Sequence, residues 1–389
     1  MPNLTNHNHK TDNQPFGVDG AHGAMLTIDP HALANNYLTL KSQLRANTRC
    51  AAVVKANAYG VGLEIAAKAF YDAGARDFFV ALPQEGAVLR KLYQDVRIFV
   101  LAGLLPGMSP FYRQLNLIAV LNSISEVEEQ AAFAVNNNIT KLAVALQFDS
   151  GMKRLGMSEA EAHILSTQSH FLEHFDLQLV MSHLACADMP QDRMNQTQLS
   201  NFRQLSQLFP KTPHSLANSS GIFLGADYHF DLVRPGIALY GGNPTPGLKN
   251  PMQPVASIHA EVLQIQHLEV GQSVGYGATW QARKPTQVAT VSTGYADGYL
   301  RSASTSSQRT RGPLAYLKGK YVPIIGRVSM DVLAIDISEF SNGHIKRGDL
   351  VELLGKHVLV DELAQGCGTI SYEILTGLGQ RYQRRTGQL

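Results

Sequence analysis

The stretch CAAVVKANAYGVGLEIAAKAFYDAGARDFFVAL, residues 50–82, contains one complete strand–helix–strand unit. Two short apolar runs, CAAVVK (50–55) and DFFVAL (77–82), flank a segment whose apolar residues recur every three to four positions. That spacing predicts an amphipathic helix between two buried strands. Because strand–helix alternation builds parallel sheet, the stretch predicts an α/β fold.

The same alternation continues to about residue 235. Six more strand-like runs follow, separated by segments with helical spacing: RIFVLA (97–102), LIAVLN (117–122), KLAVALQF (141–148), DLQLVMSH (176–183), HSLAN (214–218) and FDLVRPG (230–236). Eight such units in about 200 residues fit a closed (β/α)8 barrel better than an open sheet. A doubly wound sheet is the alternative, but no G-x-G-x-x-G follows the first strand.

The pattern changes near Pro251. The later runs alternate over longer stretches and are joined by turns, with few helices between them: ASIHAEVLQIQHL, TQVATVSTG, PLAYLKGKYVPII, VLAIDIS and LVELLG. We therefore expect a flexible tail (1–24), a barrel (25–250) and a mainly antiparallel β domain (251–389). At the start of the barrel part, residues 25–44 resemble one strand followed by a helix that begins near Pro30.

The composition excludes several classes of protein. The chain has 389 residues, of which 44% are hydrophobic and 16% charged, as in a globular enzyme of about two domains. A net charge of +2 gives no reason to expect nucleic acid or an anionic membrane as partner. No uncharged apolar run reaches the ~18–20 residues that cross a bilayer. Three scattered cysteines form no disulfide framework, which favours a cytoplasmic protein.

Polar residues stand where the predicted barrel strands end. In this fold chemistry gathers at the carboxyl ends of the strands, and here those ends carry Lys55, Arg154, His183 and Arg234. The loops after the last two strands offer the Ser219 hydroxyl and backbone N–H groups, which suit a phosphate monoester. The sequence therefore predicts a common mouth with one lysine, one histidine, two arginines and a phosphate site.

Lys55 follows the apolar residues AAVV and leaves the barrel as a lone amine. Desolvation and nearby cations lower the pKa of a lysine and make its amine nucleophilic, as a Schiff base to a carbonyl cofactor requires. The alternative for Lys55 is a lysine that extends from a strand end to solvent without a catalytic role. The alternative for His183 is a hydrogen-bonded histidine with a purely structural role. No metal site is expected, because Cys186 has no second Cys/His pair near it.

At this point the residues resemble a known family. VVKANAYGVG at 53–62 is similar to the pyridoxal-phosphate lysine motif of bacterial alanine racemases. Further motifs of that family follow in order: DSGMKRLG (149–156), SHLACAD (182–188), LANSSGI (216–222), VRPGIALYG (233–241), VGYGATW (274–280), GYADGYLR (294–301), GRVSMD (326–331) and TISYEILTGLGQR (369–381). The resemblance spans about residues 25 to 385. It implies a pyridoxal 5'-phosphate (PLP) barrel with a C-terminal β domain, in a homodimer that interconverts L- and D-alanine and supplies D-alanine for peptidoglycan.

The resemblance also implies the role of each site residue. Lys55 resembles the Schiff-base lysine and the first catalytic base, and Tyr276 the second base. Arg154 would face the phenolic oxygen of the cofactor and contact substrate, and Arg234 would face its pyridine nitrogen. The remaining cofactor residues would be Tyr59, His183, Asn218, Ser219, Gly236, Ile237 and Tyr372. Met330 and Asp331 resemble residues that line the substrate pocket from the partner subunit, and Tyr295 resembles a residue that narrows the entrance of that pocket.

These residue types suit racemisation. Two bases on opposite faces of a planar intermediate can remove an α-proton on one side and return one on the other. A tyrosine with an unperturbed pKa near 10 needs help near neutral pH, which His183 and Arg234 are placed to give. An arginine keeps its proton, so Arg234 leaves the pyridine nitrogen unprotonated and weakens the cofactor as an electron sink.

Three positions depart from the family pattern. Gln147 stands where some members carry a carbamylated lysine, Lys153 stands where glycine is usual, and Val61 replaces a common histidine. A glutamine amide forms no carbamate, so we expect no modified lysine there.

Other functions remain open at this stage. A racemase of broader specificity fits the same residues, because the width of the pocket is not visible in the sequence. A PLP decarboxylase shares the two-domain plan, but its His-x-Gly-Ser motif and catalytic cysteine are not found; Cys367 lies in a QGCGT turn. A non-catalytic PLP carrier would be a single barrel, and residues 251–389 argue against it.

Overall fold

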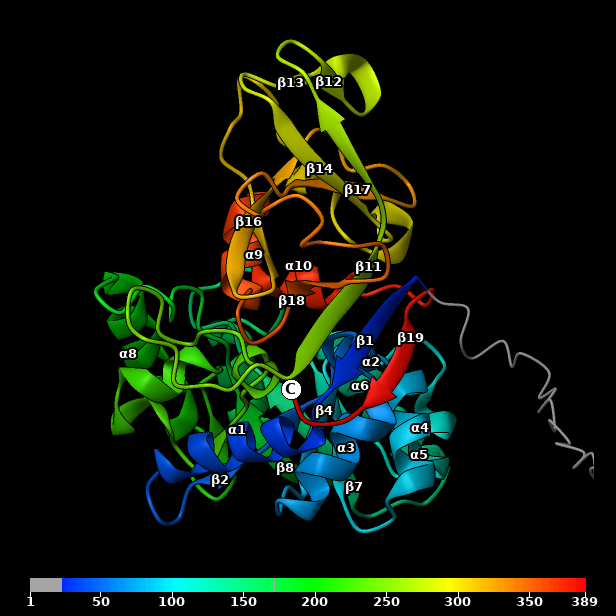
Figure 1. Cartoon of the computed structure of the whole chain (residues 1–389). Helices are drawn as coiled ribbons and strands as arrows, with labels where there is room; N and C mark the ends of the chain where they lie inside the picture. Colours follow the sequence, from blue (N-terminus) through cyan, green and yellow to red (C-terminus); the bar gives the residue numbers. More distant parts are fainter. Residues whose placement is uncertain (1–22, 169, 171) are drawn as a thin grey trace, which may run out of the picture.

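The computed structural model describes residues 23–168, 170 and 172–389. The predicted tail lies outside the described residues except for Gly23 and Ala24. Two bodies are visible in Figure 1, a lower one of alternating strands and helices and an upper one of long strands.

A parallel barrel forms the lower body. Seven strands pair side by side in chain order: β3 (Ala52–Val53), β4 (Asp77–Val80), β5 (Arg97–Val100), β6 (Ile118–Leu121), β7 (Leu142–Gln147), β8 (Phe175–Met181) and β9 (His214–Ser215). The ring closes through β10 (Leu232–Val233), which pairs in parallel with β2 (Arg49–Cys50). The amide of Arg234 donates to the carbonyl of Ala217 at 2.9 Å, which joins β10 to the segment after β9. The predicted barrel is thus confirmed, and all eight predicted runs contain its strands.

Helices cover the outside of this barrel. They are α1 (Pro30–Ser42), α3 (Leu63–Asp72), α4 (Pro83–Leu92), α5 (Ser109–Gln114), α6 (Ile124–Asn136), α7 (Glu159–Thr167) and α8 (Arg193–Gln207). A one-turn segment, α2 (Lys55–Tyr59), and the 3-10 helices η3 (Ser220–Leu224), η4 (Ala226–Tyr228) and η5 (Ile237–Tyr240) lie after strands. Helix α1 begins as expected: Pro30 is its first residue, and the Asp29 carboxylate accepts the amides of His31 and Ala32.

The core lies between the barrel strands and these helices. Phe78, Phe79 and Val80 of β4 are fully buried, as are Phe99 and Val100 of β5. Burying each side chain of this size stabilises the fold by about 1.5–3 kcal/mol. The near-continuous apolar runs of the sequence follow from this burial on both faces of a parallel sheet.

The upper body is the antiparallel domain predicted after Pro251. Its principal strands are β11 (Ala256–Leu268), β14 (Thr286–Val291), β15 (Leu314–Leu317), β16 (Lys320–Ile325), β17 (Leu333–Asp336) and β18 (Leu350–Leu354). Each pairs antiparallel with its neighbours, and β14 also pairs with β11, so the six strands close on themselves. Shorter elements complete it: β12 (Ser273–Val274), η6 (Tyr276–Ala278), β13 (Trp280–Gln281), η7 (Tyr295–Asp297), η8 (Arg301–Ala303), α9 (Val360–Cys367), α10 (Ser371–Thr376) and β19 (Gln383–Thr386).

The first strand corrects one expectation. We expected residues 25–28 to belong to the barrel, but β1 (Ala24–Ile28) pairs antiparallel with β11 and parallel with β19. Figure 1 shows β1 and β19 side by side at the junction of the two bodies. Both chain ends of the described structure therefore strengthen the sheet of the second domain. The domain limits 25–250 and 251–389 stay a prediction.

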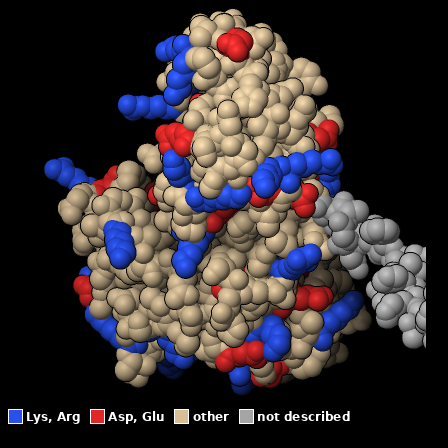
Figure 2. Space-filling model, viewed as in Figure 1, with Lys and Arg blue, Asp and Glu red and all other residues tan. Residues whose placement is uncertain are grey.

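Charged side chains of both signs are scattered over the face drawn in Figure 2. None of the described helices is long and apolar enough to span a membrane.

Candidate active site

A cavity of about 720 Å³ opens at the carboxyl ends of the barrel strands, under the second domain. Its lining includes every residue that the sequence analysis assigned to the cofactor: Lys55, Tyr59, Arg154, His183, Asn218, Ser219, Arg234, Gly236, Ile237 and Tyr372. Tyr372 comes from α10 of the second domain, and the other nine come from the barrel. The structure thus brings these residues together, while their individual roles stay predictions.

Lys55 is held by an unusual backbone turn. The four residues after it, Ala56, Asn57, Ala58 and Tyr59, all have φ between 52° and 54°. Non-glycine residues in this left-handed region cost roughly 1–2 kcal/mol each, so the turn requires support from its surroundings. The Glu85 carboxylate supplies part of it, accepting the amide of Ala56 at 2.5 Å. The turn fixes where Lys55 leaves the strand.

Electrostatics favour neutral forms of two groups in this cavity. Burial, followed by the nearby charge of Arg154, lowers the pKa of Lys55, while Glu85 acts in the opposite direction. Burial, followed by the charges of Arg234, Arg154 and Lys55, lowers the pKa of His183 to about 3. His183 is therefore neutral at pH 7, and it can relay a hydrogen bond but supplies no positive charge.

Arg234 is buried at the end of β10. Its guanidinium donates to the hydroxyl of Ser215 and to the backbone carbonyls of Ser182 and Leu216. Burial lowers the pKa of Arg234 to about 9, which still leaves the group protonated at neutral pH. Three acceptors at the ends of β8 and β9 thus fix the orientation of a positive charge in the cavity.

Hydrogen-bond donors converge at one end of the cavity. The hydroxyl of Ser219 accepts the amides of Gly236 at 2.9 Å and Ala238 at 3.2 Å. A Cβ atom on Gly236 would lie 2.2 Å from the hydroxyl oxygen of Tyr59, so only glycine lets that phenol approach the amides. The rings of Tyr59 and Tyr372 lie 5.9 Å apart. This arrangement of one hydroxyl, two amides and two phenols suits a phosphate group.

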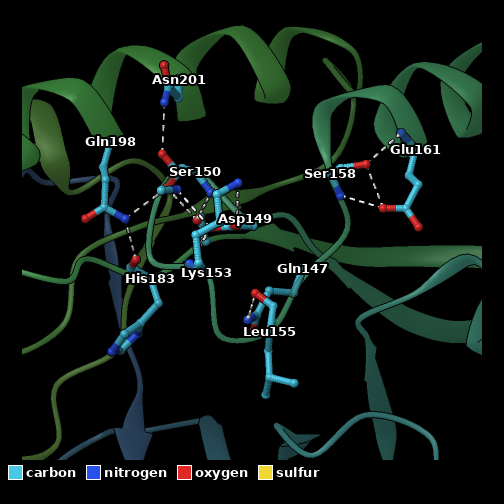
Figure 3. A network of polar contacts seen from close by, with 12 residues as sticks. Gln147, Asp149, Ser150, Lys153, Leu155, Ser158, Glu161, His183, Gln198 and Asn201 are labelled. Carbon is cyan, nitrogen blue, oxygen red and sulfur yellow. Dashed lines mark hydrogen bonds and ion pairs between the residues drawn. The ribbon is translucent and has the colours of Figure 1, made fainter.

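Gln147 is the last residue of β7, and the loop after this strand carries Lys153 and Arg154. Figure 3 shows the Gln147 amide donating to the carbonyl of Leu155 at 3.3 Å. Asp149 accepts the amides of Gly151 and Lys153 and pairs with the Lys153 ammonium at 3.1 Å. Gln147 thus supports the backbone beside Arg154, and the absence of a carbamylated lysine stays a prediction.

A buried network joins this loop to His183. Gln198 of α8 donates to the carbonyl of His183 at 2.8 Å and to the hydroxyl of Ser150 at 3.3 Å (Figure 3). The Ser150 and Ser182 hydroxyls lie 2.7 Å apart. Gln198 is fully buried, so it fixes the ends of β7 and β8 relative to each other.

Four predicted residues lie elsewhere. Tyr276, Tyr295, Met330 and Asp331 all belong to the second domain, and none of them lines the cavity in the described part of the chain. Tyr276, Tyr295 and Met330 are 72%, 41% and 53% exposed. Tyr295 and Met330 lie on adjoining segments, because the amide of Ala296 donates to the Met330 carbonyl at 3.0 Å. Arg381 donates to Asp331 at 2.8 Å and pairs with Asp297 at 3.1 Å.

Several residues of the site were not predicted from the sequence. Ser215 holds Arg234, Ala238 donates at the phosphate-type end, Glu85 holds the turn of Lys55, and Asp361 lines the cavity from α9. For Asp361 the available signal was an acidic pair just after an apolar segment, which marks a helix start and gives no hint of a site. The others have no signal, because their partners are distant in the chain.

The fold and the cavity define a barrel enzyme with its reactive side chains at the carboxyl ends of the strands. Within that class, the chain belongs to the alanine racemase family. The family model of the alanine racemase N-terminal domain matches residues 28–244, and that of the C-terminal domain matches residues 255–386.

Individual relatives agree with this assignment. The catabolic alanine racemase of Mesorhizobium japonicum is 47% identical over 367 residues, which cover 94% of each chain. The biosynthetic alanine racemase of Agrobacterium fabrum is 44% identical, over 92% of this chain and 93% of that protein. The crystal structure of alanine racemase from Bartonella henselae with covalently bound pyridoxal phosphate has a TM-score of 0.87 and 38% identity, and the match covers 94% of this chain and 99% of that one.

Proposed function

We propose that this protein is a PLP-dependent enzyme that interconverts L- and D-alanine by a two-base mechanism. One observation carries the proposal: Lys55, a half-buried lysine with a lowered pKa, shares a single cavity with a buried arginine and a set of phosphate-type donors. Membership of the alanine racemase family points to alanine as the substrate.

The residues present fit PLP. The amides of Gly236 and Ala238 both donate to the Ser219 hydroxyl, and among the described residues the structure shows no hydrogen bond of the Tyr59 or Tyr372 hydroxyl. These groups would hold the phosphate, Arg234 would face the ring nitrogen, and Lys55 would bind the cofactor covalently. When bound, PLP supplies a conjugated ring that withdraws electrons from the substrate and acidifies its α C–H bond.

Lys55 serves as the base on one face of the substrate. Its lowered pKa leaves more of the amine unprotonated near neutral pH than an ordinary lysine would provide, and the left-handed turn fixes the direction from which the amine approaches. Tyr276 serves as the base on the opposite face. Since His183 is neutral, it orients a hydrogen bond between Tyr276 and Arg234 and leaves Arg234 as the source of positive charge.

Arg234 limits the side reactions. Its protonated guanidinium would face the ring nitrogen as a hydrogen-bond donor and would not give up its proton. Arg234 would thereby leave the ring nitrogen unprotonated and limit the electron-withdrawing power of the cofactor. An acidic residue at this position would favour transamination.

A second copy of the chain completes the site. Tyr276 lies on an exposed turn of the second domain and does not line the cavity of its own barrel. Tyr295 and Met330, which lie on adjoining segments, are also exposed large side chains, and such exposure favours burial against a partner. We infer a homodimer in which these residues and Asp331 face the barrel mouth of the other subunit.

The physiological role divides into two possibilities. Similar relatives are named both catabolic and biosynthetic, so supplying D-alanine for peptidoglycan and degrading D-alanine both fit. A racemase of broader specificity is the second candidate. A cytoplasmic location stays a prediction from the cysteine content.

The test is to measure D/L interconversion across a panel of amino acids. We expect alanine to react fastest and the Lys55→Ala variant to lose at least about a thousandfold in rate, because it lacks both a base and the covalent link. Fast racemisation of several long side chains would favour the broader enzyme, and no racemisation of alanine by the PLP-loaded protein would refute the proposal.

A further inference from the structure

We propose that Asp361 is a positioning residue that docks the second domain on the barrel so that Tyr372 completes the phosphate end of the cavity. The inference rests on the proposed PLP function and concerns a residue that binds neither substrate nor cofactor in it. Asp361 lines the cavity at the start of α9, beside the Ser371–Tyr372 pair of α10.

The carboxylate of Asp361 accepts hydrogen bonds from both domains. On the barrel side, the amide of Asn243 donates to its two oxygens at 3.2 and 3.0 Å, and the Asn250 side chain donates at 3.4 Å. On the side of the second domain, the hydroxyl of Ser371 donates to it. Hydrogen bonds to a charged acceptor are about twice as strong as neutral ones. One side chain therefore links a barrel loop to the first residue of α10.

Each side of this link leads directly to the phosphate-type donors. Asn243 follows η5, and η5 begins next to Gly236, whose amide donates to Ser219. Ser371 is 7% exposed and precedes Tyr372, whose ring lies 5.9 Å from that of Tyr59. Asp361 thus fixes the distance between the amides of one domain and the phenol of the other.

Helix α10 also contacts the turn that carries Lys55, so a shift of α10 would move this turn as well as Tyr372. The carbonyl oxygen of Leu375 lies 2.0 Å from where a Cβ atom on Gly60 would be. Arg384 also donates to the carbonyl of Gly60, at 3.0 Å. Since α10 is only six residues long, the hydrogen bond from Ser371 to Asp361 restrains its first turn, as does the one from Thr369 to Glu373.

The experiment compares PLP with pyridoxal, which lacks the phosphate. Full-length protein is stripped of cofactor, and each compound is titrated by absorbance and protein fluorescence. We expect Asp361→Asn to weaken PLP binding about tenfold or more, because the new amide presents an N–H group to donors, and to change pyridoxal binding less than about twofold. The matched control is Asp336→Asn, since Asp336 also accepts an amide and a serine hydroxyl, both from Ser338 far from the cavity.

A double mutant shows whether Asp361 acts through Tyr372. If it does, Asp361→Asn adds less than about twofold to the PLP defect of Tyr372→Phe, whereas independent effects would multiply. Ser371→Ala removes the link without altering α9 and serves as the test should Asp361→Asn not fold. Equal weakening of PLP and pyridoxal, an unchanged PLP affinity, or multiplicative defects would overturn the inference. Failure of the unmodified protein to bind PLP at all would instead overturn the proposed function.

Discussion

Gly60 and Leu375 are in direct backbone contact across the domain junction. Gly60 ends the turn that carries Lys55, with φ at 84°, and a Cβ atom placed on it would lie 2.0 Å from the carbonyl oxygen of Leu375. Neither backbone segment can move away easily, because α10 is packed on α2 there. The second domain is therefore in direct contact with α2, the turn that positions Lys55.

Because of this contact, we expect Gly60→Ala to push α10 away from the turn that carries Lys55. We expect a loss of about 2 kcal/mol or more in unfolding free energy, from the positive φ and the steric overlap together, and weaker PLP binding. Gly348→Ala is the control, since Gly348 has φ of 87° but nothing within 4 Å of its Cβ position, and it should cost only about 1 kcal/mol. Equal losses from both substitutions in urea unfolding would show that the contact with Leu375 has no importance.

Lys153 offers a test of the loop beside Arg154. It adopts φ of 58°, a conformation that costs non-glycine residues about 1–2 kcal/mol. We expect Lys153→Gly to be at least as stable as the unmodified protein, since its exposed ion pair contributes little, and Lys153→Val to be about 1–2 kcal/mol less stable. Lys211→Val, at an exposed lysine without positive φ, should be nearly neutral. A fully stable Lys153→Val protein would contradict the backbone strain.

Glu352 predicts how stability depends on acid. Burial by itself would raise its pKa, but hydrogen bonds from His357 and Val358 outweigh burial and hold the pKa below its ordinary value. A carboxyl whose pKa is lowered by folding stabilises the fold above its unfolded pKa, and this contribution is lost as pH falls through the folded pKa. We therefore expect the free energy of unfolding to drop below about pH 4.

Replacing Glu352 checks that assignment. Glu352→Gln should cost about 1–3 kcal/mol at pH 7 and remove part of the acid dependence. The exposed Glu339→Gln variant should change neither. An unaltered pH profile of unfolding in Glu352→Gln would assign the acid sensitivity to other groups.

The sequence predicted the barrel well because its strands are short, fully buried and separated by periodic helices. Every predicted run from CAAVVK to FDLVRPG contains a strand. It did not predict that β1 would join the second domain, because the pairing of Ala24 with Ala260 joins residues far apart in the chain. Periodicity shows which residues are buried and leaves open against which sheet they pack.

For the site too, the sequence could place some residues and not others. Residues at strand ends, such as Lys55 and Arg234, could be placed from the order of strands and from the family motifs. The left-handed turn at Ala56–Tyr59 could not, since none of its residues is glycine. Asp361 could not either, because its partners Asn243 and Ser371 belong to different domains.

The composite site can be tested by mixing two inactive proteins, Lys55→Ala and Tyr276→Phe. If Tyr276 serves the other subunit, each mixed dimer has one intact site, and random exchange makes about half the dimers mixed, so roughly a quarter of full activity should return. If Tyr276 serves its own subunit, every site carries a lesion and no activity returns. Exchange itself is confirmed with differently tagged subunits.

Reduction of the PLP-loaded protein with borohydride tests most directly whether Lys55 binds the cofactor covalently. Reduction makes the bond between cofactor and lysine permanent, and peptide mass spectrometry then locates it. We expect a pyridoxyl label on the peptide containing Lys55 and no label in Lys55→Ala. A label on Lys68 or Lys153 instead, or none on the active protein, would contradict this expectation.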